Sequence, residues 1–404
     1  MPEYYREKYV KQLESEKNSH FIKILIGIRR SGKSTILNQY INTFKKNENI
    51  IQFDFNDLKL KKMNYEKLYD EILKVSKRNE INYLFLDEIQ EIDKWEECVI
   101  SLFENKMYKY DIYITGSNSK LLSTELSTLL TGRHSDIRVM PLTFKEFHEI
   151  SNMSNENDEL NKYIEIGGLG IIIPFIEKQE KIRNILVNVL NDTIDKDIKK
   201  RHKINNNNMI NKLMEYVLNN IGKDISTTQL EKYFKKTENK HFSYRTMDSY
   251  LQWMCDAMLL YRVNYFNVKT KTILKTTGKY YAGDLGLLHM NISNDQSILG
   301  YQIENVVLLQ LISEGYKVYT AEIYQKNKEN KGIDFVAIKE GKIKYIQVTY
   351  ELNDNNIKRE CDSLLLTKDA YEKIIIFVNA KAHPLNNGVK TINLVNWLLK
   401  KTEL

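Results

Sequence analysis

Cysteine and proline are both scarce in this chain of 404 residues. The three cysteines, Cys98, Cys255 and Cys361, lie far apart, and no CxxC pair occurs. This spacing suggests neither a disulfide framework nor a zinc site, and it favours isolated thiols in a reducing compartment. Lysine, asparagine and isoleucine are used heavily where arginine, alanine and proline could stand. We interpret this as a nucleotide bias of the genome, so lysine content alone says little about nucleic-acid binding.

Long apolar runs are lacking as well. The longest fall well short of the ~20 residues that a helix needs to cross a bilayer. The first residues, MPEYYREKYVKQLESEK, are polar and helical in pattern, unlike a secretion signal. We therefore expect a cytoplasmic protein without membrane contact. The net charge of +7 is a modest excess, which permits nucleic-acid contact without demanding it.

One stretch carries a strong motif. Residues 27–35 read GIRRSGKST, a glycine, four residues and then Gly-Lys-Ser, which forms a loop whose backbone N–H groups surround a phosphate chain. Gly32 has no Cβ, so the backbone can approach the phosphates closely. We expect Lys33 to reach the β- and γ-phosphates and Ser34 to ligate Mg²⁺. The predicted ATP-binding residues are Gly27, Arg29, Arg30, Ser31, Gly32, Lys33, Ser34 and Thr35.

The flanks of this loop have the pattern that it requires. Residues 21–26, FIKILI, are typical of a buried strand, and residues 35–44 carry apolar side chains at helical spacing. A phosphate loop joins a strand to a helix in this way, and the helix N-terminus adds its dipole and free N–H groups to anion binding. These flanks favour a nucleotide site over a chance match in a surface loop.

An acidic pair, Asp87 and Glu88, follows the apolar run of residues 83–86. Ligands of parallel sheets bind beyond the carboxyl ends of the strands. We therefore expect Asp87 to hold the Mg²⁺ shell and Glu88 to position and polarise the attacking water. The alternative is that both acids only begin a helix, and the phosphate loop earlier in the chain makes it the weaker interpretation.

Two further side chains are candidates for contact with the γ-phosphate. Residues 115–118 follow the next predicted strand, and Asn118 is favoured over Ser117 because an amide both donates and accepts hydrogen bonds. The alternative is an ordinary Gly-Ser-Asn turn. Arg133 lies in the polar loop beyond. It stays open whether Arg133 contacts the γ-phosphate, within its own chain or from a neighbouring subunit, or makes a structural ion pair.

Beyond residue 150 the motifs are weaker. Residues 205–290 predict helices joined by a short polar segment and then strands, the pattern of a winged helix-turn-helix. The basic cluster of residues 199–203 adds positive charge. Double-stranded DNA is therefore a candidate partner for residues 199–250. Small helical domains of this kind also serve protein contacts, and that alternative stays open.

The last segment has part of the pattern of a metal-dependent nuclease. Glu304 lies on a predicted helix and Asp334 on a predicted strand, where restriction endonucleases use carboxylates to hold Mg²⁺. The next strand should carry an acid and a lysine, but it reads Gln347-Val348-Thr349. We therefore expect a fold of this class without catalysis, and an active nuclease is the less favoured alternative.

Together the motifs resemble those of a family of prokaryotic AAA-type ATPases with a C-terminal domain named DUF4143. The resemblance rests on GIRRSGKST, YLFLDEIQEIDKWEE, ITGSNSKLL, TGRHSDIRVMPLTFKEF, YIEIGGLG, KYYAGDLGLLH, and GYQIENVV with GIDFVAI and YIQVTY. It implies an additional strand between the phosphate-loop strand and the acidic strand, a middle winged-helix region and a nuclease-like C-terminal fold. Gly332 stands where the family often has an acid, which weakens the case for metal chemistry.

The expected fold class is α/β. We expect a P-loop ATPase domain with a parallel sheet over residues 1–150, a helical lid or linker over 151–204, a winged-helix-like region over 205–290 and a nuclease-like domain over 291–404. The expected function is Mg²⁺-dependent hydrolysis of ATP, used as a conformational switch. ATP-regulated DNA binding is the main alternative, and a protein partner and an oligomer are both open.

Overall fold

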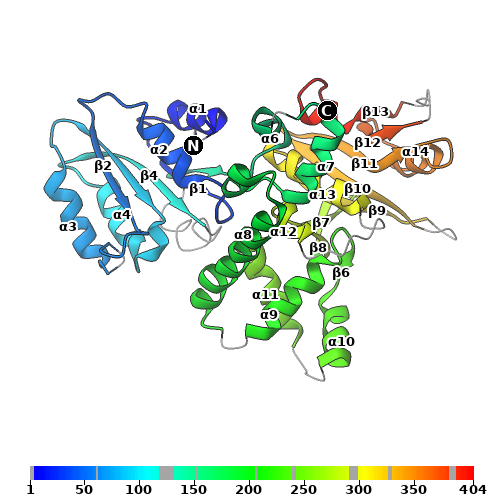
Figure 1. Cartoon of the computed structure of the whole chain (residues 1–404), viewed down its shortest axis with the longest axis horizontal. Helices are drawn as coiled ribbons and strands as arrows, with labels where there is room; N and C mark the ends of the chain where they lie inside the picture. Colours follow the sequence, from blue (N-terminus) through cyan, green and yellow to red (C-terminus); the bar gives the residue numbers. More distant parts are fainter. Residues whose placement is uncertain are drawn as a thin grey trace. The chain divides into compact units, whose positions relative to one another are not determined.

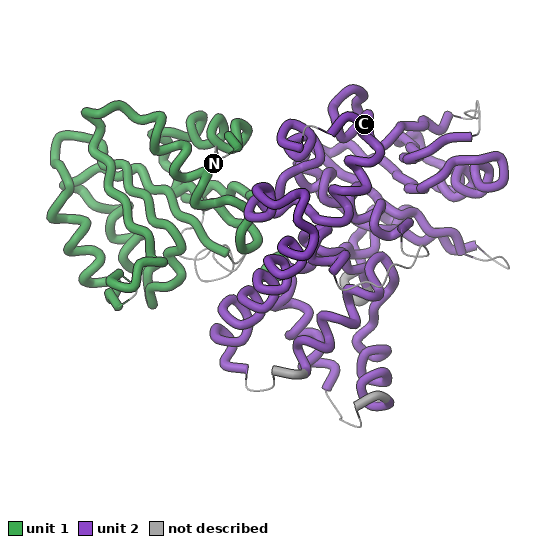
Figure 2. The backbone as a smooth tube through the Cα atoms, in the orientation of Figure 1, with its two compact units in different colours: residues 1–140, 256–258 green, residues 141–255, 259–404 purple. Residues whose placement is uncertain are grey.

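The computed structural model of the chain describes residues 4–60, 62–117, 132–151, 153–204, 207–238, 243–290, 299–325, 330–381 and 388–404. The chain forms two compact units, coloured separately in Figure 2: residues 1–140 with 256–258, and residues 141–255 with 259–404. The first boundary falls before the predicted residue 150 because Leu142 already pairs within the second unit. Its N–H donates to the carbonyl oxygen of Gly168 over 2.7 Å.

The first unit is built around a five-stranded parallel sheet in the order β2-β3-β4-β1-β5 (Figure 1). Its strands are β1 (Ile22–Ile26), β2 (Asn49–Asp54), β3 (Ile81–Asp87), β4 (Lys109–Gly116) and β5 (His134–Arg138). Strand β4 lies between the phosphate-loop strand β1 and the acidic strand β3. The additional strand implied by the family resemblance is therefore confirmed.

The core of this unit forms on both faces of the sheet, because successive side chains of a strand point to opposite faces. In β3, Tyr83 and Phe85 pack with helices α1 (Glu7–Ser15) and α2 (Lys33–Ile41), while the equally buried Leu84 and Leu86 point to the other face of the sheet. Helices α3 (Tyr65–Val75) and α4 (Trp95–Phe103) pack against each other, and α4 also packs against β4. A short 3-10 helix, η1 (Ile89–Glu91), follows β3.

The second unit contains an eight-stranded sheet in the order β13-β12-β11-β10-β9-β7-β8-β6. Its strands are β6 (Asp224–Ile225), β7 (Leu260–Asn267), β8 (Thr272–Ala282), β9 (Lys317–Ile323), β10 (Lys331–Lys339), β11 (Lys342–Leu352), β12 (Glu372–Ala380) and β13 (Lys390–Asn393). Strands β7 and β9 join through a parallel pair, Tyr265 with Thr320. The segments predicted as separate domains on either side of residue 290 therefore share one sheet.

The order of elements in this unit agrees with the two patterns predicted from the sequence, the winged-helix pattern and the nuclease-like pattern. Helix α9 (Asn207–Leu218), strand β6, helices α10 (Thr227–Glu238) and α11 (Tyr244–Asp256), and strands β7 and β8 follow one another as in the winged-helix pattern. Helix α13 (Leu299–Ser313), strands β9 to β11, helix α14 (Ile357–Leu365) and strand β12 come next. The parallel α/β class of the first unit is confirmed, and the winged-helix and nuclease-like interpretations stay predictions.

The remaining helices pack around this sheet or lead to it. They are α6 (Phe144–Ser151), α7 (Glu156–Ile166), η3 (Gly170–Phe175), α8 (Gln179–Asp192), the π-helix η4 (Thr193–Lys200), α12 (Leu285–His289) and α15 (Leu394–Leu398). In the part of the chain that the structure describes, the helices are too short or too polar to span a bilayer.

A buried carboxylate, Asp284, joins the motif KYYAGDLGLLH, in which it lies, to the motif YIEIGGLG. It caps α12 through the N–H groups of Gly286 and Leu287, and it also accepts from the N–H of Gly168 at 2.8 Å. Gly167 has a φ of +77°, and a Cβ on Gly168 would lie 2.3 Å from the Leu142 carbonyl oxygen. Only glycines fit this turn, which explains the glycine pair in YIEIGGLG by packing.

Candidate nucleotide site

The phosphate loop begins where β1 ends and closes where α2 begins. Gly32 is the N-cap of α2 and has a φ of +97°, in the left-handed region that favours glycine. At Gly27 a Cβ would lie 2.3 Å from the Val139 carbonyl oxygen and 2.7 Å from the Ser31 Oγ. Both glycines of the motif are therefore required by the backbone. The loop places the N-terminus of α2 at the carboxyl edge of the sheet.

Lys33 lies inside this loop and is buried. Its Nζ donates to the carbonyl oxygens of Gly27 at 3.0 Å and Ile28 at 3.3 Å, and it lies 3.8 Å from a carboxylate oxygen of Glu88. The loop and the acidic pair come from different strands, separated in the sheet by β4. The structure thus brings Lys33 and Glu88 together at one end of the sheet, as the sequence predicts.

Asp87, the last residue of β3, stands beside Ser34. The Ser34 hydroxyl hydrogen-bonds to the Asp87 carboxylate, and so does the Thr115 hydroxyl from the neighbouring strand β4. Burial raises the pKa of Asp87, and these two hydrogen bonds oppose that shift. Both predicted Mg²⁺ ligands therefore lie at one point.

Glu88 is held at its backbone by Thr115 and at its carboxylate by Gln90. Its φ of +55° turns the chain sharply after the strand, and its N–H donates to the Thr115 hydroxyl oxygen over 2.9 Å. The Gln90 side-chain amide donates to the Glu88 carboxylate and, at 3.4 Å, to the Ser117 hydroxyl oxygen. The polar contacts from β4 and its tip are therefore made by Thr115 and Ser117, and the predicted Asn118 lies outside the described residues.

Arg133 lies at the other edge of the sheet. Its carbonyl oxygen accepts the N–H of Ile22, the first residue of β1, whereas the phosphate loop follows the last residue of β1. Its guanidinium pairs with Glu104, and both side chains are about half exposed. The structure does not bring Arg133 to the loop of its own chain, because parallel strands separate their two edges by their full length. A role in a neighbouring subunit stays a prediction.

Sequence reasoning missed Arg6, which is buried at the start of α1. Its guanidinium donates to the carbonyl oxygen of Ser31 in the loop and to that of Met140, both at 3.2 Å. The same group stacks over the Tyr9 ring at 4.7 Å, and the Tyr9 hydroxyl accepts the Met140 N–H. Arg6 thereby ties the phosphate loop to Met140, where the first segment of the first unit ends.

Comparisons with known proteins agree with this geometry. A family model described as an AAA domain matches residues 19–148. The chain is 30% identical over 405 residues to an uncharacterized protein of Haemophilus influenzae, covering 98% of each. It is 34% identical over 367 residues to one of Methanocaldococcus jannaschii, covering 88% of this chain and 78% of the other. The chain belongs to this family of AAA-domain proteins.

The rest of this AAA-domain protein differs from the predicted resemblance. A model for a domain of unknown function, DUF8612 and not DUF4143, matches residues 157–297. Among solved structures, a Walker-type ATPase of Pyrococcus abyssi superimposes with a TM-score of 0.50 at 14% identity, covering 72% of this chain and 98% of that one. This likeness supports a P-loop ATPase fold.

The AAA-domain protein also contains the predicted acidic group of the second unit. The Tyr281 hydroxyl donates to the Glu304 carboxylate at 2.8 Å, Asp334 accepts the Val348 N–H at 2.8 Å, and the Gln347 side chain accepts the Asp334 N–H at 3.3 Å. Desolvation raises the pKa of Glu304 to about 8 and that of Asp334 to about 6.

The charge of Asp334 adds to the pKa shift of Glu304, and that of Lys279 opposes it. Among the described residues, no three His, Cys, Asp or Glu side chains are grouped to hold a metal ion. Glu304 and Asp334 are therefore neighbours, as the sequence predicts, and Gln347 stands beside them in place of the third acid.

Proposed function

We propose that this protein hydrolyses ATP with Mg²⁺ at the carboxyl edge of the first sheet. The observation that carries the proposal is the meeting of Ser34 with Asp87 and of Lys33 with Glu88, because the four residues come from two segments and converge on one loop. A loop that binds phosphates needs only backbone N–H groups and a lysine. The second pair, Asp87 and Glu88, is what hydrolysis requires in addition.

Ser34 and Asp87 would hold the metal ion. They fit it, because a hydroxyl and a carboxylate oxygen already face each other and hard oxygen ligands are those that Mg²⁺ prefers. When bound, the ion neutralises negative charge that develops on the phosphates. Lys33 would exchange its contacts with the loop carbonyls for contacts with the β- and γ-phosphates.

Glu88 would accept a proton from the attacking water as its oxygen bonds to the γ-phosphorus. The bond from the γ-phosphorus to the bridging oxygen breaks in the same step, so ADP leaves and phosphate is formed. The Thr115 hydroxyl fixes the backbone of Glu88 and the Gln90 amide fixes its carboxylate, so the base is held in one orientation. The Gln90 amide also contacts Ser117, which lies at the tip of β4. If Ser117 contacts the γ-phosphate, the phosphate and Glu88 would be linked through this one amide.

Two substitutions test this assignment. We expect Lys33→Ala to abolish ATP binding, measured with a fluorescent ATP analogue. We expect Glu88→Gln to retain binding and to lose at least about 100-fold in phosphate release, which is the usual contribution of a positioned base. Lys77→Ala and Glu80→Gln are matched controls, since both side chains lie exposed elsewhere in the first unit. Normal turnover by Glu88→Gln would show that another group polarises the water.

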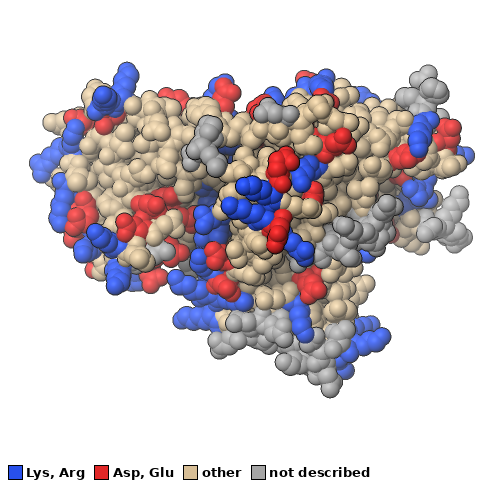
Figure 3. Space-filling model, viewed as in Figure 1, with Lys and Arg blue, Asp and Glu red and all other residues tan. Residues whose placement is uncertain are grey.

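DNA binding is a second candidate, favoured by the helix order in the second unit. Tyr244 and Arg245 at the start of α11 are exposed, with Tyr244 at 54%. The basic cluster contributes less than its sequence suggests, because Lys199 is only 13% exposed and pairs with Asp195. Charges of both signs are interspersed over the face shown in Figure 3. A DNA contact would therefore centre on α11.

Duplex titration at two salt concentrations tests this candidate. We expect affinity for a labelled duplex to fall steeply between about 50 and 200 mM salt, because each phosphate contact releases a counterion. Arg245→Ala should weaken binding and reduce the salt slope, whereas Lys381→Ala, an exposed lysine far along the chain, should change it little. A duplex that fails to bind at the lower salt concentration would exclude the DNA candidate.

A further inference from the structure

The sheet of the second unit splits between two neighbouring strands. Strands β7 and β9 are parallel and register at one pair, Tyr265 with Thr320. Beyond this point β7 pairs only with β8 on its far side, and β9 only with β10, in the ladders of the described residues. The two facing strand edges, residues 266–267 and 321–323, therefore diverge instead of bonding to each other.

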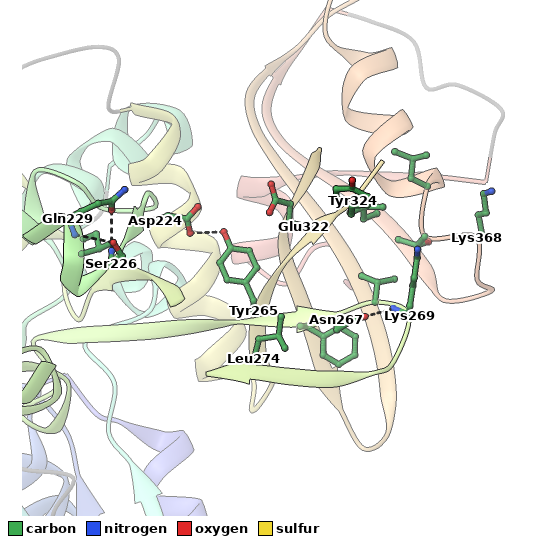
Figure 4. A pocket seen from close by; sticks show the side chains of 16 residues that line it. Asp224, Ser226, Gln229, Tyr265, Asn267, Lys269, Leu274, Glu322, Tyr324 and Lys368 are labelled. Carbon is green, nitrogen blue, oxygen red and sulfur yellow. Dashed lines mark hydrogen bonds between the residues drawn. The ribbon is translucent and has the colours of Figure 1, made fainter. Parts of the chain in front are cut away.

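The split opens into a cavity of about 770 Å³ (Figure 4). This volume lies in the range of ligand-binding pockets. Its floor is apolar and buried, formed by Ile225, Phe266 and Ile323. Its rim carries Leu274 and Tyr324, which are large apolar side chains with exposures of 47% and 70%. Apolar groups thus continue from the floor to the surface.

We name this cavity the slot. Acidic residues lie toward one of its ends and basic residues toward the other. Asp224 lies at the end of the slot beside the start of α10, where it accepts the Tyr265 hydroxyl. Glu322 on β9 lies on the other side of Tyr265 (Figure 4). Lys269 and Lys368 lie toward the other end. Two acids at one end and two lysines at the other favour an occupant with charges of both signs along its length.

We propose that the slot binds an extended peptide segment of a partner protein, which adds main-chain hydrogen bonds to the edges of β7 and β9. The peptide places an apolar side chain against Phe266 and Ile323, a basic residue toward Asp224 and Glu322, and an acidic residue toward Lys269 and Lys368. Strand addition supplies affinity from the backbone, and pockets for side chains supply specificity.

The chemistry of the slot favours a peptide over a nucleic acid. Asp224 and Glu322 would repel phosphates, and the balance of two acids and two lysines gives no net attraction for a polyanion. Diverging strand edges offer N–H and C=O groups at the spacing of another extended chain. This site is independent of the ATP site, since all its residues belong to the second unit.

The proposal is tested on the full chain with defined peptides. The probe is a fluorescent eight-residue peptide with alternating apolar residues, lysine near one end and glutamate near the other. Two reference peptides replace the apolar residues by serine or carry the two charges on the same end. We expect saturable binding of the first peptide and binding at least about tenfold weaker for both references.

Variants of the rim locate the binding. Leu274→Glu and Glu322→Lys should each weaken peptide binding by about tenfold or more. Ile273→Glu is the matched control, because Ile273 directly precedes Leu274 on β8, is 43% exposed and does not line the slot. Thermal unfolding of each variant checks that it folds. In hydrogen exchange, the peptide should slow the amides of residues 266–268 and 321–323.

Three results would overturn the proposal. The first is that neither the probe peptide nor a peptide with its sequence reversed binds. The second is equal weakening by Ile273→Glu and Leu274→Glu, which would place the peptide elsewhere. The third is displacement of the peptide by duplex DNA at low salt, which would assign the slot to nucleic acid instead.

Discussion

Single side chains hold the nucleotide site together across long sequence distances. The Thr115 hydroxyl fixes both Asp87 and Glu88, and Arg6 contacts Ser31 and Met140. The partners lie between 25 and 134 residues away from each of these side chains. That the glycines, Lys33 and the acidic pair lie close together was predictable, because the signal of each motif is local. Thr115 and Arg6 were not, because a hydroxyl or a guanidinium acquires such a role only when the strand order is known.

A second residue-scale feature is the pair of neighbouring acids in the second unit, of which Glu304 is buried and Asp334 is half-buried. The folded-state pKa of Glu304 is raised to about 8 from an ordinary value of 4.5, by burial and by the neighbouring Asp334. A raised pKa means that the folded state holds the proton more tightly than the unfolded state does. The stability that this proton supplies is complete below about pH 4.5 and is lost as the pH rises through about 8.

Glu304→Gln is expected to reduce this pH dependence. Glutamine keeps an oxygen acceptor for the Tyr281 hydroxyl but does not ionise, so the variant should lose less stability than the unmodified protein between about pH 5 and 8. The measurement is the urea midpoint at the two pH values. Glu340→Gln, an exposed acid in the turn between β10 and β11, is the control. Parallel pH curves for Glu304→Gln and the unmodified protein would contradict the assigned shift.

At the scale of elements, the sequence predicts strands and helices better than it predicts which of them are neighbours. The run of residues 83–86 and the helical spacing after the phosphate loop were sufficient for β3 and α2. The placement of Arg133 was not recoverable in this way, because it depends on Arg133 standing directly before β5, at the amino edge of the sheet and not at the carboxyl edge. A polar stretch of sequence has no periodicity that would reveal which edge of the sheet it reaches.

The sheet of the second unit shows the same limit. The sequence patterns predicted a winged-helix-like region that ends at residue 290 and a nuclease-like domain that begins at residue 291. The boundary does not separate two sheets, because β7 on one side of it and β9 on the other pair at Tyr265 and Thr320. A single parallel pair leaves no mark in either strand's sequence. The slot between these strands was therefore invisible to sequence analysis.

At the scale of the whole molecule, Arg6 connects nucleotide binding to the chain that leads into the second unit. One of its N–H groups binds the loop at Ser31 and another binds Met140, after which the chain continues into the second unit. Ordering of the loop by phosphates would act on the Ser31 carbonyl. Through Arg6 the same change would reach Met140. Such a route would be needed if ATP hydrolysis acts as the conformational switch that the sequence leads us to expect.

Arg6→Ala should separate ATP binding from its effect on the second unit. Leaving the carbonyl oxygens of Ser31 and Met140 without this donor should destabilise the first unit by about 1–3 kcal/mol. Hydrogen exchange in a Glu88→Gln background, with and without ATP, is the measurement. We expect ATP to change exchange in both units when Arg6 is present, and only in the first unit in Arg6→Ala. Lys11→Ala, on the exposed side of the same helix, is the matched control. An unchanged response of the second unit in Arg6→Ala would mean that the signal takes another route.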